Sequence, residues 1–196
     1  MERVFNVSLV GVGGQGILLI SDVLAQAAAR AGHDVKKSEI HGMAQRGGAV
    51  LAHLRLSSEP IHSDLIAAGS ADVVLAVEPM EALRQAESLS PRGVILANAR
   101  PVRNIGDYPE LDDILAALRA FPLNVVIDAE QVAQDAGNAR AMNMVMLGAV
   151  SPFLEFPDDL LATTISDTFA RKGPEVIAVN LKAFAAGREA GLAVKR

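Results

Sequence analysis

The chain has 196 residues, of which 51% are hydrophobic, and its formal net charge is −5 at pH 7. This length suits one well-buried domain, and an acidic chain without a basic run is a poor partner for nucleic acid or an anionic membrane. Cysteine is absent, which excludes disulfides and thiolate-ligated zinc or iron–sulfur sites on this chain. No apolar run approaches the length of a membrane span, so we expect a cytoplasmic protein.

The first predicted element is a buried strand that runs from Val4 into a glycine-rich turn. The turn reads Gly11-Val12-Gly13-Gly14-Gln15-Gly16 and leads into a helix from about Gly14 to Ala31. Glycine permits the backbone angles of such a turn and a close approach of a ligand to the main chain. The first amides of the helix therefore lie bare at the end of a strand, where an anion is favoured.

Three of these glycines, Gly11, Gly13 and Gly16, fit the fingerprint of dinucleotide-binding proteins. The usual companion of that fingerprint is an acidic residue about 20 positions later, at the end of the second strand. Asp34 lies roughly there, but two lysines follow almost at once. A glycine fingerprint alone is a weak signal, so a dinucleotide site is the less favoured interpretation of the turn.

A short strand is predicted from Asp34 to Ser38. The segment that follows, Ser38 to Gly48, is rich in polar residues and glycine. This strand–helix–strand order predicts the start of a parallel sheet. The segment itself predicts a short helical turn that places His41 and Gln45 on one face and leaves Arg46 able to hold a carboxylate or phosphate. A solvated connecting loop is the competing interpretation, but carboxyl ends of strands are where open α/β sheets bind ligands.

Further along, a strand over residues 49–56 would have one wholly apolar face and a second face that carries two polar side chains, which predicts a half-exposed strand near a sheet edge. The apolar face has Val50, Ala52, Leu54 and Leu56, and the other has Ala49, Leu51, His53 and Arg55. No helix-length segment precedes this strand, so an antiparallel strand is favoured. His53 and His62 lack metal-ligand spacing and are interpreted as structural histidines. From residue 72 the pattern is again parallel α/β, with strands at 73–77, 94–97 and 124–127 and helices at 79–88 and 111–120. Glu78 and Asn98 follow two of these strands, either as ligand contacts or as cap and turn residues.

The C-terminal part of the chain is helical. Arg140 to Val150 is apolar on nearly every side, which predicts a buried helix whose methionines pack and in which the amide of Asn143 is hydrogen-bonded. Two further helices begin near Asp158 and at Pro174. We therefore predict an α/β fold: a Rossmann-like, open, mostly parallel sheet with helices on both faces, one antiparallel edge strand and a helical C-terminus. Residues 1–196 are expected to form one domain, with the last two helices, from about 158, packed as an appendage.

Four segments together resemble the gamma-type domain of 2-oxoacid:ferredoxin oxidoreductases. The four segments occur in the family's order and span essentially the whole chain. They are the glycine turn at 11–16, His41-Gly42-Met43-Ala44-Gln45-Arg46-Gly47-Gly48, Ala71-Asp72-Val73-Val74-Leu75-Ala76 and Asn143-Met144-Val145-Met146-Leu147-Gly148. Pyruvate- and oxoglutarate-type members tend to carry Gly-Pro-Glu-x-Arg-Gly-Gly where this chain has Gly42-Met43-Ala44-Gln45-Arg46-Gly47-Gly48. The chain is thus most similar to the beta subunits of the indolepyruvate (arylpyruvate) branch.

The resemblance implies a share in a larger reaction, in which a 2-oxoacid is decarboxylated on thiamine diphosphate and oxidised through iron–sulfur clusters. The product leaves as an acyl-CoA, and ferredoxin is reduced. This chain lacks cysteine and the Gly-Asp-Gly motif that holds thiamine diphosphate and its Mg, since Gly106-Asp107-Tyr108 is not one. The resemblance therefore places thiamine diphosphate, Mg, the 4Fe–4S clusters and the contact with ferredoxin on a catalytic alpha subunit. This chain would complete the active site or a CoA channel, where CoA and the 2-oxoacid meet.

The family's CoA role falls, by resemblance, on the amides of residues 13–16 and on Arg46 as their charge partner. We expect no catalytic residue and no metal ligand on this chain. Two alternatives stay open: a stand-alone dinucleotide-binding protein that uses the same turn, and a purely structural subunit without ligand contact. The candidate binding residues are Gly11, Gly13, Gly14, Gln15, Gly16, Ser38, His41, Gln45, Arg46 and Gly47.

Overall fold

The sheet at the centre of the computed structural model has six strands. The structure describes residues 3–42, 47–103 and 105–195, and the strands are β1 (Phe5–Val12), β2 (Asp34–His41), β3 (Ala49–Ser57), β4 (Ala71–Ala76), β5 (Leu89–Asn98) and β6 (Asn124–Ile127). Their order across the sheet is β2-β3-β1-β4-β5-β6. β1, β4, β5 and β6 pair in parallel, whereas β3 is antiparallel to both of its neighbours. The predicted open, mostly parallel sheet with an antiparallel strand near one edge is confirmed.

The position of β3 is the feature that the strand–helix–strand pattern did not predict. β3 lies between β1 and β2, so these two strands run in the same direction without pairing. β2 also continues to His41, where His41 pairs with Val50. The prediction of a helical turn from Ser38 is therefore wrong for residues 38–41, because backbone pairing with β3 extends the strand. Residues 43–46 lie outside the described part of the chain.

The helices begin close to where their N-terminal signals predict. They are α1 (Ile17–Arg30), α2 (Pro79–Arg84), α3 (Leu111–Arg119), α4 (Ala129–Ala136), α5 (Met142–Val150), α6 (Asp158–Thr168) and α7 (Pro174–Lys195), with 3-10 turns η1 (Ala86–Ser88), η2 (Ala139–Ala141), η3 (Ser151–Phe153) and η4 (Ala170–Lys172). α2 and α7 each open on a proline, which has no N–H to leave unsatisfied there. No helix in the described residues is both long and apolar enough to span a membrane.

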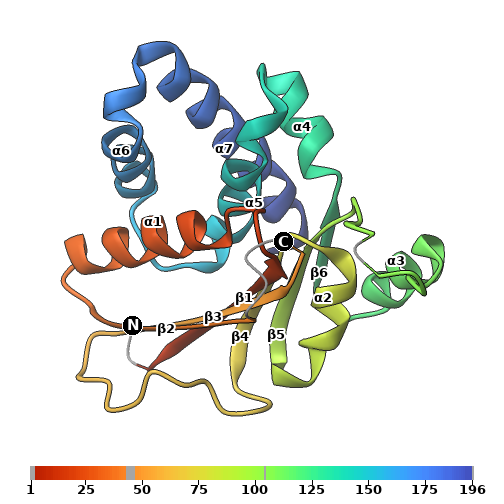
Figure 1. Cartoon of the computed structure of the whole chain (residues 1–196). Coiled ribbons are helices and arrows are strands. Elements are labelled where there is room, and N and C mark those ends of the chain that lie inside the picture. Colours follow the sequence, from red (N-terminus) through yellow and green to blue (C-terminus); the bar gives the residue numbers. More distant parts are fainter. Residues whose placement is uncertain (1–2, 43–46, 104, 196) are drawn as a thin grey trace.

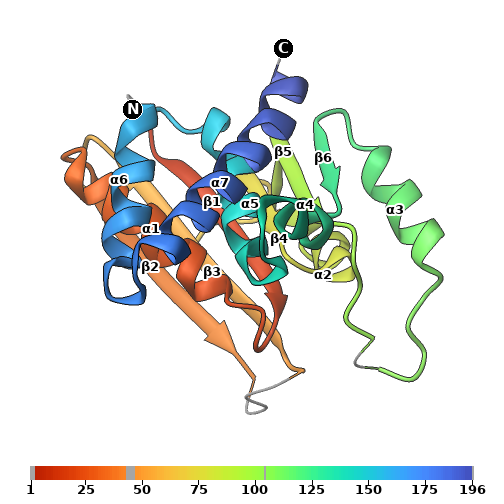
Figure 2. The same cartoon turned by 90° about the horizontal axis from the view of Figure 1, so that it is seen from above.

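Helices cover both faces of the sheet (Figures 1 and 2). On one face α1, α4, α5, α6 and α7 pack on strand residues such as Leu9, Leu75 and Leu96. On the other face α2 and α3 pack on residues such as Val74 and Ile95. The central strands are thus buried on both sides, which explains their continuous apolar sequence.

α5 and α7 pack backbone against backbone. A Cβ atom built on Gly187 would lie 1.9 Å from the carbonyl oxygen of Val145, and one on Gly148 would lie 2.0 Å from that of Phe184. Only glycine allows this approach, because any side chain would separate the two helices. Ala183 and Phe184 of α7 are buried in the same core as α5.

Candidate functional site at the glycine turn

The glycine turn after β1 is tied to the chain just before β3. Gly14 and Gly16 have φ of 100° and 75°, the left-handed region that favours glycine. The amide of Gly13 donates to the carbonyl of Gly48 at 2.8 Å, and the amide of Gly47 donates to the carbonyl of Gly13 at 3.4 Å. The structure therefore brings Gly13 and Gly47 of the predicted site side by side.

Gln15 and Gly11 form the framework of the turn. The Gln15 side chain accepts from the amide of Val12 at 2.8 Å and donates to the carbonyl of Val77 at 3.0 Å. It thereby joins the carboxyl end of β1 to the end of β4. Gly11 is buried, and a Cβ there would lie 2.4 Å from Val77 and 2.9 Å from the Gln15 side-chain oxygen. These two residues therefore fix the conformation of the turn relative to β1 and β4.

A crevice of about 400 Å³ opens beside the turn, lined by Val12, Gly13, Gly14, Gly16, Ile17, Leu18, His41 and Val50. Within the described residues, no acceptor pairs with the amides of Gly14 and Gly16, and no side chain caps α1. The positive end of the α1 dipole and these bare N–H groups favour an anion. Leu18, which is 37% exposed, and Val50 add an apolar wall that the sequence analysis did not assign to the site.

The remaining predicted site residues are distributed unevenly. His41 is exposed at the end of β2 and lines the crevice, with its Nδ1 3.3 Å from the carbonyl oxygen of Gly42. Ser38 lies three residues earlier in β2, opposite His53, and is not among the residues lining the crevice. Gln45 and Arg46 lie outside the described residues.

Asn143 is a neighbour of the turn that the sequence analysis treated only as a buried amide. Its Nδ2 donates to the carbonyl of Gly16 at 3.4 Å, whereas its Oδ1 is buried with no partner among the described residues. A Cβ on Gly16 would lie 2.3 Å from that Nδ2. The predicted hydrogen bond of Asn143 is thus confirmed for the N–H side only. A single asparagine in an otherwise apolar helix was the signal for this contact.

Glu78 and Asn98 have structural roles, as predicted for cap and turn residues. The fully buried Glu78 carboxylate accepts from the amide of Glu81 at 2.9 Å and from the hydroxyl of Tyr108 at 2.5 Å. Burial and this carboxylate together raise the pKa of Tyr108 well above its ordinary value. Asn98 is also fully buried, and its Oδ1 accepts from the amide of Ala129 at 3.1 Å. Both side chains secure the connections that follow β4 and β5.

Asp34 lies at the wrong end of β2 for a dinucleotide site. It begins the eight-residue strand that His41 ends, and at about 3.3 Å per residue the two are separated by about 23 Å. Its carboxylate accepts from the amide of Ile61 at 2.6 Å, and this bond lowers the pKa of Asp34. A ribose bound at the glycine turn is therefore out of its reach, and β3 occupies the place beside β1 that the second strand takes in a dinucleotide fold.

His53, in β3, is held by a hydrogen bond, as expected of a structural histidine. The Nδ1 of His53 accepts from the amide of Ile66 at 3.1 Å, and burial lowers the pKa of His53. The neutral ring is therefore the form that the fold favours. In the part of the chain that the structure describes, no three His, Asp or Glu side chains could share a metal ion.

Known proteins match nearly the whole chain. The sequence profile of the family described as "Pyruvate ferredoxin/flavodoxin oxidoreductase" matches residues 6–190. The chain is 38% identical over 191 residues to "Indolepyruvate oxidoreductase subunit IorB" of Archaeoglobus fulgidus, covering 93% of this chain and 92% of that protein. It is 36% identical to the subunit of the same name from Thermococcus kodakarensis, with 95% of each chain covered.

A solved structure shares the fold over nearly the whole chain. It is the 2-oxoglutarate:ferredoxin oxidoreductase of Magnetococcus marinus, with 2-oxoglutarate, coenzyme A and succinyl-CoA bound. The TM-score is 0.79 at 27% sequence identity, and the match covers 98% of this chain. Our chain spans only 32% of the chain in that structure, so the fold described above corresponds to one part of a larger polypeptide there.

Proposed function

The chain belongs to the pyruvate ferredoxin/flavodoxin oxidoreductase family, and from this premise we propose that it is the indolepyruvate-type subunit that completes the active site or CoA channel of the assembled enzyme. The reaction is the oxidative decarboxylation of a 2-oxoacid to an acyl-CoA, with ferredoxin as electron acceptor. A cysteine-free chain supplies no thiolate ligand for a cluster. A catalytic partner subunit is therefore proposed to carry thiamine diphosphate, Mg and the 4Fe–4S clusters.

The observation that carries the proposal is the pairing of Gly13 with Gly47 and Gly48. Arg46 immediately precedes Gly47 in the chain, and we propose it as the charge partner of the bare amides. Coenzyme A bears a pyrophosphate and a further phosphate on its ribose. Amides at a helix N-terminus and a guanidinium are the groups that proteins use to bind phosphate. The related enzyme with coenzyme A bound makes this ligand the leading candidate.

Each part of the crevice has a role in this proposal. The amides of Gly14 and Gly16 donate to a phosphate, and Arg46 neutralises its charge. Leu18 and Val50 pack against an apolar part of the ligand, because both line the crevice. His41 lies at the rim of the crevice, at the end of β2. None of these residues transfers a proton or forms a bond; they bind and orient the acceptor of the acyl group.

Kinetics of the assembled enzyme test the role of Arg46. The chain is co-expressed with its catalytic subunit, and Arg46→Ala is compared with Arg119→Ala, which removes an exposed arginine from α3. We expect Arg46→Ala to raise the KM for CoA about tenfold, the effect of one lost charge-assisted hydrogen bond. The KM for the 2-oxoacid should stay unchanged, and Arg119→Ala should alter neither value. An unchanged KM for CoA in Arg46→Ala would favour the purely structural subunit.

The subunit role has its own test, separate from the site. The chain alone should show no oxidoreductase activity, and it should copurify with a thiamine-dependent partner. Full activity of the lone chain would refute the subunit role. The substrate class is tested by comparing kcat/KM for indolepyruvate and pyruvate in the complex, where we expect indolepyruvate to be preferred. Calorimetry of the chain with NAD, FAD and CoA addresses the stand-alone dinucleotide-binding protein, which neither the relatives nor the position of Asp34 favours.

A further inference from the structure

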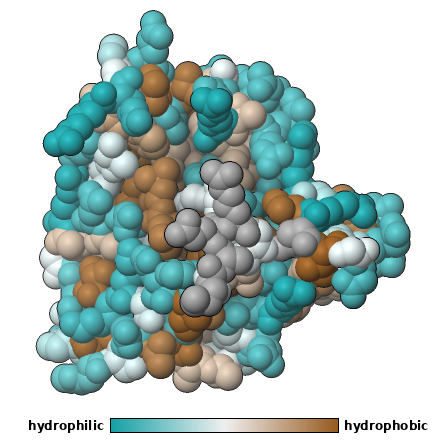
Figure 3. Space-filling view, in the orientation of Figure 1, coloured by the Kyte–Doolittle hydropathy of each residue, from teal (hydrophilic) through white to brown (hydrophobic). Residues whose placement is uncertain are grey.

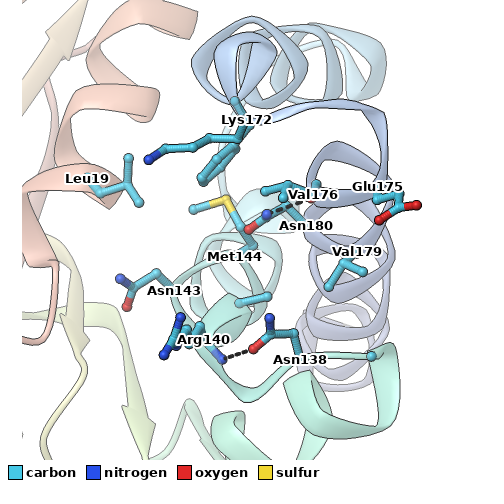
Figure 4. A pocket seen from close by; sticks show the side chains of 13 residues that line it. Leu19, Asn138, Arg140, Asn143, Met144, Lys172, Glu175, Val176, Val179 and Asn180 are labelled. Atoms are coloured by element: carbon cyan, nitrogen blue, oxygen red, sulfur yellow. Dashed lines mark hydrogen bonds between the residues drawn. The ribbon is translucent and has the colours of Figure 1, made fainter.

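A second cavity lies on the helical side of the sheet, separate from the crevice at the glycine turn. It measures about 450 Å³ and is bounded by α1, α5, α7 and the chain around η2 and η4. Its apolar walls come from Leu19, Met144, Phe169, Val176 and Val179 (Figure 4). Figure 3 shows apolar side chains gathered over α1 and in the space between α6 and α7. The size and the apolar walls are those of a small-molecule site.

Two cations stand at the rim of this cavity. Arg140 and Lys172 are exposed side chains that line it, and neither forms an ion pair with a described residue. Figure 4 shows the ammonium group of Lys172 extending toward Leu19, while the carboxylate of Glu175 points away from both cations. An apolar chamber with an unneutralised positive rim favours a ligand that has an apolar body and an anionic head.

One residue that lines the cavity has a buried side-chain oxygen with no hydrogen-bond partner among the described residues. This residue is Asn143, and the oxygen is its Oδ1. Asn143 thus adds one polar side chain to the wall that α5 forms, beside the apolar side chain of Met144.

We propose that this cavity binds a small amphipathic carboxylate. Its apolar body fills the space between α1, α5 and α7, and its carboxylate pairs with Arg140 and Lys172. The inference does not rest on CoA binding at the glycine turn, because the residues that line the two hollows are different. Asn143 joins them, since it lines this cavity and donates to the carbonyl of Gly16. A ligand here therefore contacts the residue that braces the turn.

Calorimetry on the full-length chain tests the proposal with two probes, indole-3-acetate and octanoate. Indole-3-acetamide serves as the control, because it keeps the indole body and removes the charge. We expect saturable 1:1 binding of at least one carboxylate, and binding of the acetamide at least about tenfold weaker than that of indole-3-acetate if the aryl probe binds. The ratio of the two carboxylate affinities then identifies the body as aryl or alkyl.

Two charge variants locate the binding. Arg140→Gln and Lys172→Gln should each weaken the bound carboxylate about tenfold. Arg171→Gln, an exposed neighbour that does not line the cavity, should leave the affinity unchanged. Circular dichroism confirms that each variant is folded. The proposal is overturned if neither carboxylate binds saturably, if the acetamide binds as tightly as indole-3-acetate, or if the affinity is the same in Arg140→Gln and Lys172→Gln as in the unmodified chain.

Discussion

Replacing Gly16 by alanine should damage the turn through two separable effects. The first is backbone strain, because Gly16 has φ of 75° and an alanine in this region costs about 1–2 kcal/mol. The second is a steric clash, because the new Cβ would lie 2.3 Å from Nδ2 of Asn143. This clash is with the end of one side chain, so it should cost about 1–2 kcal/mol, the lower part of the range for crowding. Gly16→Ala should therefore lower the free energy of unfolding by about 2–4 kcal/mol.

Two further variants separate these effects. Gly32 has φ of 80° and no atom within 4 Å of its ideal Cβ, so Gly32→Ala measures the strain alone. In an Asn143→Ala background the clash is gone, and Gly16→Ala should cost only about 1–2 kcal/mol, the strain term. The difference between the two backgrounds is the coupling energy of the pair, expected to be about 1–2 kcal/mol.

Urea unfolding followed by far-UV circular dichroism gives all four free energies in this cycle. A thermal scan should agree, since about 2–4 kcal/mol corresponds to a fall in Tm of roughly 4–16 °C for a chain of this size. The reasoning fails if Gly16→Ala costs the same with and without Asn143. It also fails if Gly16→Ala is no worse than Gly32→Ala.

Three other features of the structure give measurable consequences. Gly187→Ala would place a Cβ 1.9 Å from the carbonyl oxygen of Val145, so it should destabilise the chain by about 2 kcal/mol or more in thermal unfolding. Ala185→Gly, at an exposed position of the same helix, measures the change in helix propensity between alanine and glycine, about 1 kcal/mol. A Gly187→Ala variant at least as stable as the unmodified chain would contradict the close contact of α5 and α7. Burial lowers the pKa of His53, so the folded state favours the neutral imidazole ring. The stability that this preference contributes is complete above the unfolded pKa of about 6.5 and is lost as the pH falls through the folded pKa. Urea midpoints measured from pH 7.5 down to 5 should fall less in His53→Gln than in the unmodified chain. In the control His62→Gln, which changes an exposed histidine, the midpoint should fall with pH as steeply as in the unmodified chain. An equal fall in all three proteins would refute the assignment of this pH dependence to His53. Tyr108→Phe removes the 2.5 Å hydrogen bond to the buried Glu78 carboxylate, which should cost about 1.5–3 kcal/mol in urea unfolding, and an unchanged midpoint would show that this bond contributes nothing.

Local signals in the sequence were enough for most of the element boundaries. β6 spans Asn124–Ile127 as predicted, and α3 begins at Leu111 as predicted. Asp128 caps α4 through a hydrogen bond from the amide of Gln131, as its position indicates. Such features depend on neighbours within four residues, so caps, prolines and apolar periodicity specify them.

Long-range pairing decided the features that the local signals missed. β2 was expected to end at Ser38, yet it continues to His41 because β3 offers a partner for each residue. Asp34 has the right spacing for a ribose contact, but the direction of β2 carries it to the far end of the sheet. Strand order and direction depend on contacts between distant segments, which a local pattern does not contain.

By itself, the sequence determined the glycine turn, the order of strands and helices, and the absence of thiolate ligands, since these follow from residue types and short spacings. Only the tertiary structure placed β3 between β1 and β2, paired Gly13 with Gly47, and brought Asn143 to Gly16 across 127 residues. It also formed the cavity between α1, α5 and α7. The physical reason is that burial of apolar faces sets how the elements pack, and that packing selects which distant polar groups meet.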